Sequence, residues 1–356
     1  MYRLLDKPEL PFHPLYINLE HILTAGDFMV ELMAVLLRDR HFARIGTVIW
    51  QEAKGFGKFI RDLSSMVDVG GIKVQLREST DVPQHWLSYG ERVMSSLSKQ
   101  DPRLLLLLDE FAVMIDHIAQ ENPRDAEQLL RWFRAVRIAP GTMSRFVIGG
   151  SINLVATLDS MGLVDTVNDL SIERLKPFDS AIAERFIRAI FASRRMRLDA
   201  SVLKLIMELV GTPIPYLLAV FLTAILDRQR ATGKKVTGEM VQAAFEEDLL
   251  GGATSITFQH YRSRIDQYYA GFEPRSAKVI LGMLSRSETP IRNESLYELF
   301  VRVNGVNPSA ESNEAFKLLM NRLENDFYIV NNEGSYDFFS RVLKLWWKTH
   351  YGFQIE

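Results

Sequence analysis

The pair Asp109 and Glu110 is the part of this sequence best suited to chemistry, because it directly follows five consecutive leucines, Leu104 to Leu108. An apolar run of this kind is typical of a strand buried on both faces, and open α/β sheets bind ligands at the carboxyl ends of their strands. An aspartate there can orient the water shell of a magnesium ion, and a glutamate can polarise an attacking water. That division of labour is typical of nucleotide hydrolases, although acids also commonly follow strands in turns.

A hydroxyl is expected at the same edge. Residues 145–148 predict a short apolar strand that ends in Gly149-Gly150-Ser151. In a parallel sheet Ser151 would lie beside the acid pair, where it can sense a γ-phosphate, and Asn153 is a second polar candidate. The alternative is a serine in an ordinary strand-to-loop turn.

A proline-rich turn, Gly211-Thr212-Pro213-Ile214-Pro215, precedes a helix that runs to about residue 228. Proline in the first turn of a helix is ordinary start chemistry. The functional interpretation is a rigid apolar edge against which an adenine can pack.

Alternating strands and helices are expected to position these residues. Apolar stretches predict strands at 15–19, 104–108, 145–148 and 170–175, with helices near 25–37, where Thr24 serves as the cap, 87–97 and 124–136. This alternation predicts an α/β fold with a parallel sheet covered by helices. Within 41–85, the pair Gly70-Gly71 between alternating apolar residues predicts an inserted hairpin.

The pattern changes after Pro177. Helical spacing recurs at 183–191, 201–209, 215–228 and 238–250, which predicts a helical subdomain. Three more helices, near 275–285, 293–301 and 312–323, lead into 327–330, a turn at 331–334, and 336–339. Three helices followed by a β-hairpin predict a winged helix-turn-helix.

Composition limits the class of protein. The 42 basic and 44 acidic residues give a net charge of -2, which argues against a surface that grips nucleic acid over its whole extent. The absence of cysteine excludes disulfides and thiolate metal sites, as suits a reducing interior. No apolar run approaches the roughly 18 residues of a membrane span, and no signal-peptide core is present, so we expect a cytoplasmic protein without membrane contact.

Several motifs together resemble the prokaryotic AAA+/STAND-type ATPases, the archaeal-type ATP-binding proteins. The order and spacing of Leu104 to Glu110, Gly149-Gly150-Ser151, Leu175-Lys176-Pro177-Phe178 and Gly211-Thr212-Pro213 match that family, and Leu345-Trp346-Trp347 resembles its winged-helix tail. The resemblance covers nearly the whole chain from Leu15 onward. It implies a P-loop NTPase-like core at 1–178, a helical lid at 179–254 and a winged helix at 255–356.

The same resemblance implies roles for individual residues. Asp109 is the expected magnesium ligand, Glu110 the water-activating acid and Ser151 the sensor. Pro213, with Gly211 and Pro215 around it, is the expected contact of the lid with the nucleotide. ATP and Mg²⁺ are the implied cofactors, and an ATP-hydrolysing, nucleotide-dependent switch is the implied function.

The sequence departs from the family at the phosphate-binding loop. A strand, a Gly-Lys-Ser/Thr loop and a helix, together roughly 30 residues, should precede the strand matched to 15–19, and only 14 residues do. Residues 2–7 resemble the end of the loop's helix, so we expect the reading frame as given to begin downstream of the loop. The dipeptide Gly57-Lys58 is no substitute, because Glu52 occupies the first glycine position and Phe59 follows the lysine. Without the loop most of the phosphate-binding energy is lost.

The loss also has a structural consequence. In the resembled fold the missing strand lies between the strand that leads to Ser151 and the last strand, predicted here at 170–175. Its removal leaves two unpaired strand edges, a configuration that proteins avoid or fill. We therefore expect the two strands to close up or the gap to be filled.

Three functions remain open: an ATP-dependent switch that is incompetent without its loop, a non-hydrolysing scaffold or regulator, and a DNA-binding regulator. Residues 255–356 contain equal numbers of basic and acidic side chains, which favours a protein partner over DNA. Arg131, Arg134 and Arg137 recur every three residues. They fit either an arginine finger in a homo-oligomer or, as we favour, a solvated helix face.

Overall fold

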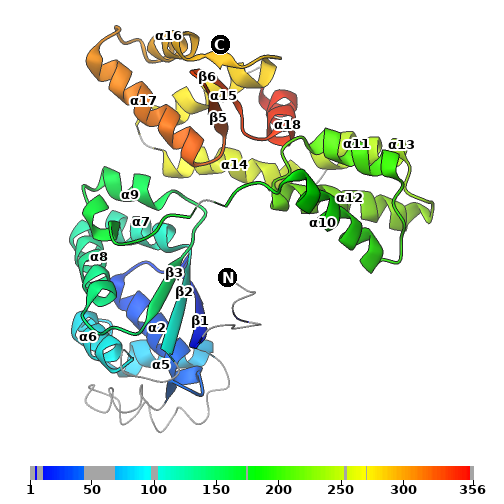
Figure 1. Cartoon of the computed structure of the whole chain (residues 1–356). Coiled ribbons are helices and arrows are strands. Elements are labelled where there is room, and N and C mark those ends of the chain that lie inside the picture. Colours follow the sequence, from blue (N-terminus) through cyan, green and yellow to red (C-terminus); the bar gives the residue numbers. More distant parts are fainter. Residues whose placement is uncertain are drawn as a thin grey trace. The chain divides into compact units, whose positions relative to one another are not determined.

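The computed structural model describes residues 5, 11–43, 69–97, 103–173, 175–251, 255–269 and 271–352. The chain divides into two compact units, Met1–Ile172 and Glu173–Glu356, and each is described by itself below (Figure 1). Among the described residues, no helix is both long enough and apolar enough to cross a membrane.

The first unit is built on a parallel sheet of three described strands in the order β1-β2-β3. These are β1 (Phe12–Asn18), β2 (Arg103–Asp109) and β3 (Arg145–Ile148). The register pairs Asn18 with Asp109 on one side of β2 and Leu108 with Ile148 on the other, so the carboxyl ends of all three strands lie at one edge. The predicted parallel α/β sheet is confirmed, and β2 begins and ends within one residue of the leucine run.

Helices cover one face of this sheet. In chain order the described elements between and after the strands are α2 (Ala25–Arg38), α5 (Val69–Ser79), α6 (Trp86–Leu97), α7 (Phe111–Glu121), α8 (Pro123–Ile138), α9 (Leu154–Ser160) and the 3-10 turn η1 (Val164–Val167). Leu104, Leu106 and Leu108 pack with these helices in one hydrophobic core, as alternation along a strand requires. Figure 1 shows α2, α6 and α8 on the same side of the strands.

Helix α2 begins where the sequence predicts. The Thr24 hydroxyl accepts a hydrogen bond from the Asp27 N–H at 3.0 Å and so satisfies one of the free amides of the first turn. Gly26 is required there, because a Cβ atom would lie 2.6 Å from the Pro83 carbonyl oxygen. The cap prediction is confirmed.

The hairpin predicted around Gly70-Gly71 is wrong, because this segment forms helix α5. Ile72 and Leu76 are buried and Val74 is 51% exposed, so the buried positions recur every four residues rather than every two. Lys73 also pairs with Glu31 of α2 at 2.6 Å. Residues 45–50, 55–59 and 67, which entered the same predictions, lie outside the described residues.

The strand predicted at 170–175 is also wrong: residues 171–173 and 175 have no regular structure, and Leu175 is 91% exposed. The sheet topology explains the difference. A strand needs a neighbour that accepts its hydrogen bonds, and none of the described strands pairs with this segment. In the described part of the sheet, β3 is therefore an edge strand.

The second unit is mainly helical. Its elements are α10 (Ser180–Ser193), α11 (Ala200–Val210), α12 (Pro215–Thr232), α13 (Gly238–Ala243), the π-helical turn η2 (Ala244–Leu250), α14 (Ser255–Tyr268), α15 (Glu273–Arg286), β4 (Ile291–Arg292), α16 (Asn293–Asn304), α17 (Ala310–Asn325), β5 (Ile329–Asn332), β6 (Ser335–Phe338) and α18 (Arg341–Tyr351). The predicted helices and the antiparallel hairpin are present, and β4 adds a short third strand beside β6. The helix predicted at 238–250 becomes a π turn in its second half.

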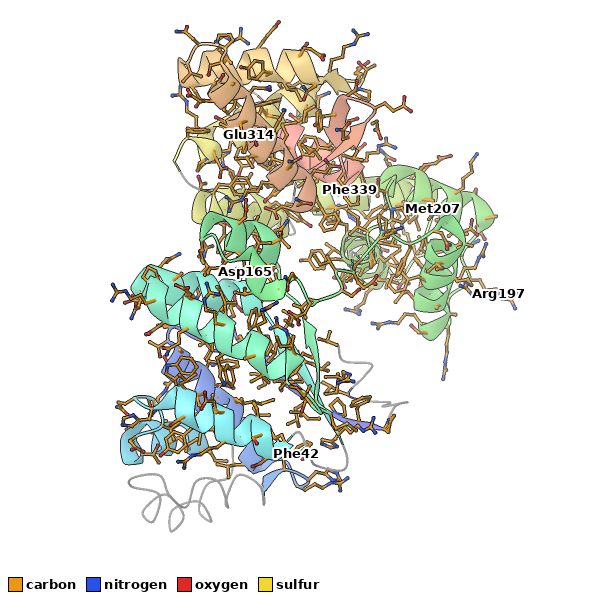
Figure 2. The ribbon with its side chains drawn as sticks, turned by 60° about the vertical axis from the view of Figure 1, so that its left-hand side comes forward. Phe42, Asp165, Arg197, Met207, Glu314 and Phe339 are labelled. Carbon is orange, nitrogen blue, oxygen red and sulfur yellow. The ribbon has the colours of Figure 1, made fainter. Side chains whose placement is uncertain are left out.

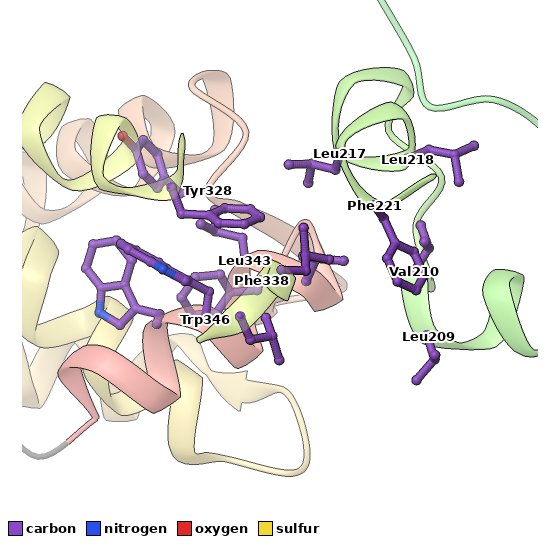
Figure 3. Packing of buried hydrophobic residues seen from close by; sticks show 14 of the residues in the cluster. Leu209, Val210, Leu217, Leu218, Phe221, Tyr328, Phe338, Leu343 and Trp346 are labelled. Carbon is purple, nitrogen blue, oxygen red and sulfur yellow. The ribbon is translucent and has the colours of Figure 1, made fainter. Parts of the chain in front are cut away.

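A single hydrophobic core runs through this unit (Figure 3). Phe221 and Val210 from the helical segment belong to the same cluster as Tyr328, Phe338 and Trp346 from the C-terminal segment. The guanidinium of Arg341, at the start of α18, donates to the Glu208 carbonyl of α11. The division of residues 179–356 into a lid and a winged helix stays a prediction.

Candidate functional site

The acid pair lies at the carboxyl edge of the parallel sheet, where β2 passes into α7. Asp109 and Glu110 are both half-buried. One carboxylate oxygen of Asp109, Oδ2, accepts the Tyr16 hydroxyl at 2.8 Å, and the other, Oδ1, accepts the Glu110 N–H at 3.2 Å. The aspartate is thus fixed by neutral donors, and among the described residues it forms no ion pair with a lysine or arginine.

Glu110 and Ser151 are in direct contact. The Glu110 Oε2 atom accepts the Ser151 N–H at 2.9 Å and the Ser151 hydroxyl at 2.8 Å. The β3 register causes this contact, since the Gly149 N–H bonds to the Leu108 carbonyl and the Phe111 N–H bonds to the Gly149 carbonyl. Three residues predicted separately from sequence are therefore neighbours at one sheet edge.

The backbone of Glu110 is strained. Its φ of 56° lies in the left-handed region, which costs a residue with a Cβ roughly 1–2 kcal/mol. The residue precedes α7 without a side-chain cap, so its carboxylate is directed to Ser151 rather than to the first amides of the helix. Strain of this kind is common where a side chain is held for a purpose other than stability.

Asn153 has a local role. Its side chain accepts the Ala156 N–H at 3.1 Å and caps α9. The amide oxygen is thereby occupied at the start of a helix, so the contact found for the second polar candidate is structural.

Tyr16 is the site residue that sequence reasoning missed. It is paired in register with Leu107, and side chains alternate along both strands, so Tyr16 and Asp109 emerge on the same face of the sheet. The only signal in the sequence was that Tyr16 lies two residues before the end of a strand, on the same side of that strand as its last residue. To infer the contact with Asp109 from this signal, one would need the register between β1 and β2, which are far apart in the sequence.

The turn predicted to contact a nucleotide lies in the second unit. Gly211 ends α11 with a φ of 67°, and Pro215 is the first residue of α12. The Pro213 carbonyl accepts the Phe178 N–H at 3.1 Å. A Cβ at Gly211 would lie 3.1 Å from the Arg341 Cβ, so α18 closes over this turn. The joining of Gly211, Pro213 and Pro215 with the acid pair in one pocket stays a prediction.

The arginine row on α8 is tied to the segment that follows α9. Arg131 contacts Asp165, labelled in Figure 2, at 3.5 Å, and Arg134 donates to the Asn168 amide oxygen at 3.1 Å. Arg137 binds both carboxylate oxygens of Asp169, at 2.9 and 2.8 Å. Because the Arg137 side chain is only 4% exposed, it is neither part of a solvated face nor available as a finger.

Comparison with known proteins identifies the fold. No family model and no curated protein matches the sequence. Among solved structures, the Walker-type ATPase of Pyrococcus abyssi is similar at 15% identity and a TM-score of 0.56, over 94% of this chain and 83% of that one. The ORC2 protein of Aeropyrum pernix, solved with ADPNP and ADP, is similar at 14% identity and a TM-score of 0.52, over 95% of this chain and 77% of that one. The chain has the α/β fold of these two proteins.

Proposed function

We propose that this chain is the switch portion of a STAND/AAA+-type ATPase. Its first unit would hold the acids of a nucleotide site, residues 179–254 would form the lid over the base, and residues 255–356 would form a winged helix that binds a protein. The observation that supports this most is the contact of Glu110 with Ser151 beside Asp109, at the sheet edge where this fold binds ligands.

The acid pair fits a magnesium ion bound beside a phosphate. Mg²⁺ typically keeps several waters and binds one or two carboxylates together with substrate phosphates, and Asp109 presents such a carboxylate. A bound ion would neutralise charge on the phosphate oxygens. The triphosphate cradle fits less well, since the 356 residues contain no Gly-x-x-x-x-Gly-Lys-Ser/Thr segment. We therefore infer that this chain by itself binds ATP weakly and does not turn it over.

A calorimetric titration with ATP and Mg²⁺ tests the proposal. The 356-residue chain is expected to bind with a Kd weaker than about 1 mM, and a chain extended by the residues encoded directly upstream of Met1 is expected to reach micromolar affinity. In the extended chain Asp109→Asn should weaken Mg²⁺-dependent binding about tenfold. Asp159→Asn, an exposed change in α9, is the matched control. An extended chain without affinity for ATP would end the proposal.

The two hydrogen bonds that Ser151 donates to Glu110 favour a second candidate function, a non-hydrolysing regulator. Both donors of Ser151 bind a single oxygen of this carboxylate, so that oxygen is already occupied and is not free to orient a water molecule. Turnover by the extended chain separates the candidates. Glu110→Gln should lower the turnover of an ATPase at least a hundredfold, and should leave the nucleotide affinity and partner binding of a scaffold unchanged.

For the proposed winged helix, the outer face of α17 suits a protein better than DNA. Arg322 contacts Glu273 at 2.9 Å and stacks on the Tyr269 ring. Its positive charge is therefore paired within the unit and is not directed to a phosphate. Leu318 is 50% exposed, and Glu314, labelled in Figure 2, is exposed on the same helix. We expect no binding of duplex DNA by fluorescence anisotropy between 50 and 200 mM salt. Binding that weakens steeply with salt would assign this surface to DNA.

A further inference from the structure

Five arginines lie close together in the sequence, on α10 and on the loop that joins it to α11. We call them the arginine cluster: Arg185, Arg188, Arg194, Arg195 and Arg197, the last labelled in Figure 2. All five residues are exposed, and none of their side chains forms an ion pair or a hydrogen bond with another residue that the structure describes. By contrast, Arg228 and Arg230 on α12 of the same unit both contact carboxylates.

The packing of α10 places its arginines on the side away from the core. The buried residues of this helix recur every four positions and define its inner face: Ala183, Ile187 and Phe191. Arg185 and Arg188 lie about one turn apart on the opposite face. Ala189 and Ala192 are exposed on the same face, and their short side chains let another chain approach the helix closely.

The end of α10 holds two of the arginines in a tight turn. Arg194 is the C-cap, and Arg195 has a φ of 58°, in the left-handed region that glycine or asparagine usually occupies after a helix. The Met196 N–H bonds to the Phe191 carbonyl at 3.0 Å and closes the turn. An arginine in this conformation is strained, and retained strain indicates a role other than stability. The alternative is that the helix dipole favours positive charge at this end of α10.

A second loop adds positive charge beside the cluster. Lys235, in the loop after α12, pairs with Asp199 at the start of α11 at 2.7 Å, so the charge of this carboxylate is matched. The neighbouring Lys234 is exposed, and its side chain has no partner among the described residues. At the other end of α10, Asp179 and Glu184 are exposed and limit the positive surface.

We propose that the arginine cluster binds a short acidic segment of a partner protein in an extended conformation. Guanidinium groups bind carboxylates through pairs of hydrogen bonds, and arginine clusters are a common means of recognising acidic motifs. At 1.5 Å per residue, the helix spaces Arg185 and Arg195 by roughly 15 Å, which matches four or five residues of an extended chain. This binding requires no nucleotide, and its surface is separate from the proposed winged helix.

The same surface fits other anionic partners less well. A DNA duplex carries a charge about every 1.7 Å of its axis, so its backbone would continue past the cluster and meet Asp179 and Glu184. Ile182, at 37%, is the only large apolar side chain that is exposed within the described residues 180–210. A membrane-bound helix or a broad protein interface would need a larger apolar area.

The test uses the full 356-residue chain and two fluorescein-labelled peptides of twelve residues, in which either glutamate or glutamine alternates with serine. Fluorescence anisotropy at 50 mM salt should give a Kd below about 1 mM for the glutamate peptide, at least tenfold tighter than for the glutamine peptide. At 300 mM salt the glutamate peptide should bind at least fivefold more weakly, because salt screens exposed charges. Equal binding of the two peptides, or tighter binding of a 20-base-pair duplex than of the glutamate peptide, would overturn the proposal.

A double variant assigns the binding to α10. Arg185→Gln combined with Arg188→Gln should weaken binding of the glutamate peptide about tenfold, and the fold should tolerate both changes because both residues are exposed. Arg286→Gln combined with Arg302→Gln is the matched control, since it removes the same charge from exposed positions on α15 and α16 of the same unit. The control should change the Kd less than twofold. Equal losses in the two double variants would mean that binding follows net charge alone, against the proposal.

Arg195→Gly separates binding from stability. Glycine relieves the left-handed strain, so the urea midpoint should rise, while the loss of one charge should weaken binding of the glutamate peptide about threefold. A lower midpoint with unchanged binding would mean that Arg195 serves the helix dipole instead, and would remove it from the proposed surface.

Discussion

Each unit contains an aspartate that accepts a hydrogen bond from a tyrosine hydroxyl. In the first unit Tyr16 donates to Asp109 at 2.8 Å, and in the second Tyr269 donates to Asp326 at 2.9 Å. The surroundings differ. Asp109 ends a strand at the carboxyl edge of a sheet beside a second acid, whereas Asp326 is the C-cap of α17 and accepts from Tyr269, whose ring lies under the Arg322 guanidinium. Both bonds are part-buried, but the first lies at a strand end beside Glu110 and the second is made by a buried tyrosine.

The two environments have different consequences. Burial, followed by the neighbouring Asp326 charge, raises the pKa of the Tyr269 hydroxyl, so this group remains a donor at all ordinary pH values. Burial also raises the pKa of Asp326, against the opposing effects of Tyr269, Arg264 and Arg322. Because Asp326 is partly buried and its donor Tyr269 is buried, this carboxylate depends on its partners more than a surface carboxylate does. At the sheet edge of the first unit, Asp109 is half-buried, so a water molecule can take over the hydrogen bond that Tyr16 donates. A ligand that displaces Tyr16 would therefore cost Asp109 little.

The largest expected effect is the difference in stability lost when Tyr269 and Tyr16 are each replaced by phenylalanine. Tyr269→Phe leaves the Asp326 carboxylate without its buried donor, and we expect the second unit to lose about 2 kcal/mol of stability. Tyr16→Phe should cost the first unit less than about 0.5 kcal/mol, because solvent reaches Asp109. Hydrogen exchange measured peptide by peptide reports each unit separately. Equal losses in the two units would remove the distinction between edge and interior.

A smaller effect concerns pH. Because the folded state raises the pKa of Asp326 above its value of 3.8 in the unfolded chain, the folded unit holds this proton more tightly. The stability from this group is therefore complete below the unfolded pKa and is lost as pH rises through the folded pKa. Asp326→Asn keeps an oxygen that accepts from Tyr269 and removes the titration. Its urea midpoint should fall less than that of the natural protein between pH 4 and 7, and should be the higher of the two at pH 7. A parallel decline in both proteins would contradict the assignment.

The sequence predicted features that depend on local pattern. The leucine run defined β2, Thr24 defined the start of α2, and the spacing after residue 275 defined three helices and a hairpin. The same reasoning placed Asp109, Glu110 and Ser151 at one edge because parallel strands bring their carboxyl ends together. These inferences needed only the period of the apolar residues and the rule for ligand position.

Features that depend on pairing between distant segments were predicted wrongly or missed. Residues 170–175 have the composition of a strand, but 171–173 and 175 form none, since a strand exists only where a neighbour accepts its hydrogen bonds. The alternation of Ile72, Val74 and Leu76 is equally compatible with a helix whose buried positions are four apart, and packing on α2 decides in favour of the helix. Helix α7 was missed because it directly follows the acid pair without a capping residue. The ion pair of Arg137 with Asp169 could not be foreseen from a row of three arginines.

The smallest expected effect is the difference in stability cost between two serine-to-alanine changes, one in each unit. Ser340 is buried and caps α18, where its hydroxyl accepts the Leu343 N–H at 3.3 Å. Replacing such a cap with alanine typically costs about 1 kcal/mol. Ser151 is exposed and donates to Glu110, and in Ser151→Ala the backbone N–H of the same residue still binds that carboxylate while water replaces the hydroxyl. We expect Ser340→Ala to destabilise the second unit by about 1 kcal/mol and Ser151→Ala to destabilise the first by less than about 0.5 kcal/mol in hydrogen exchange. If Ser151→Ala proves the costlier change, its contact with Glu110 is a folding contact rather than a replaceable one at a ligand site.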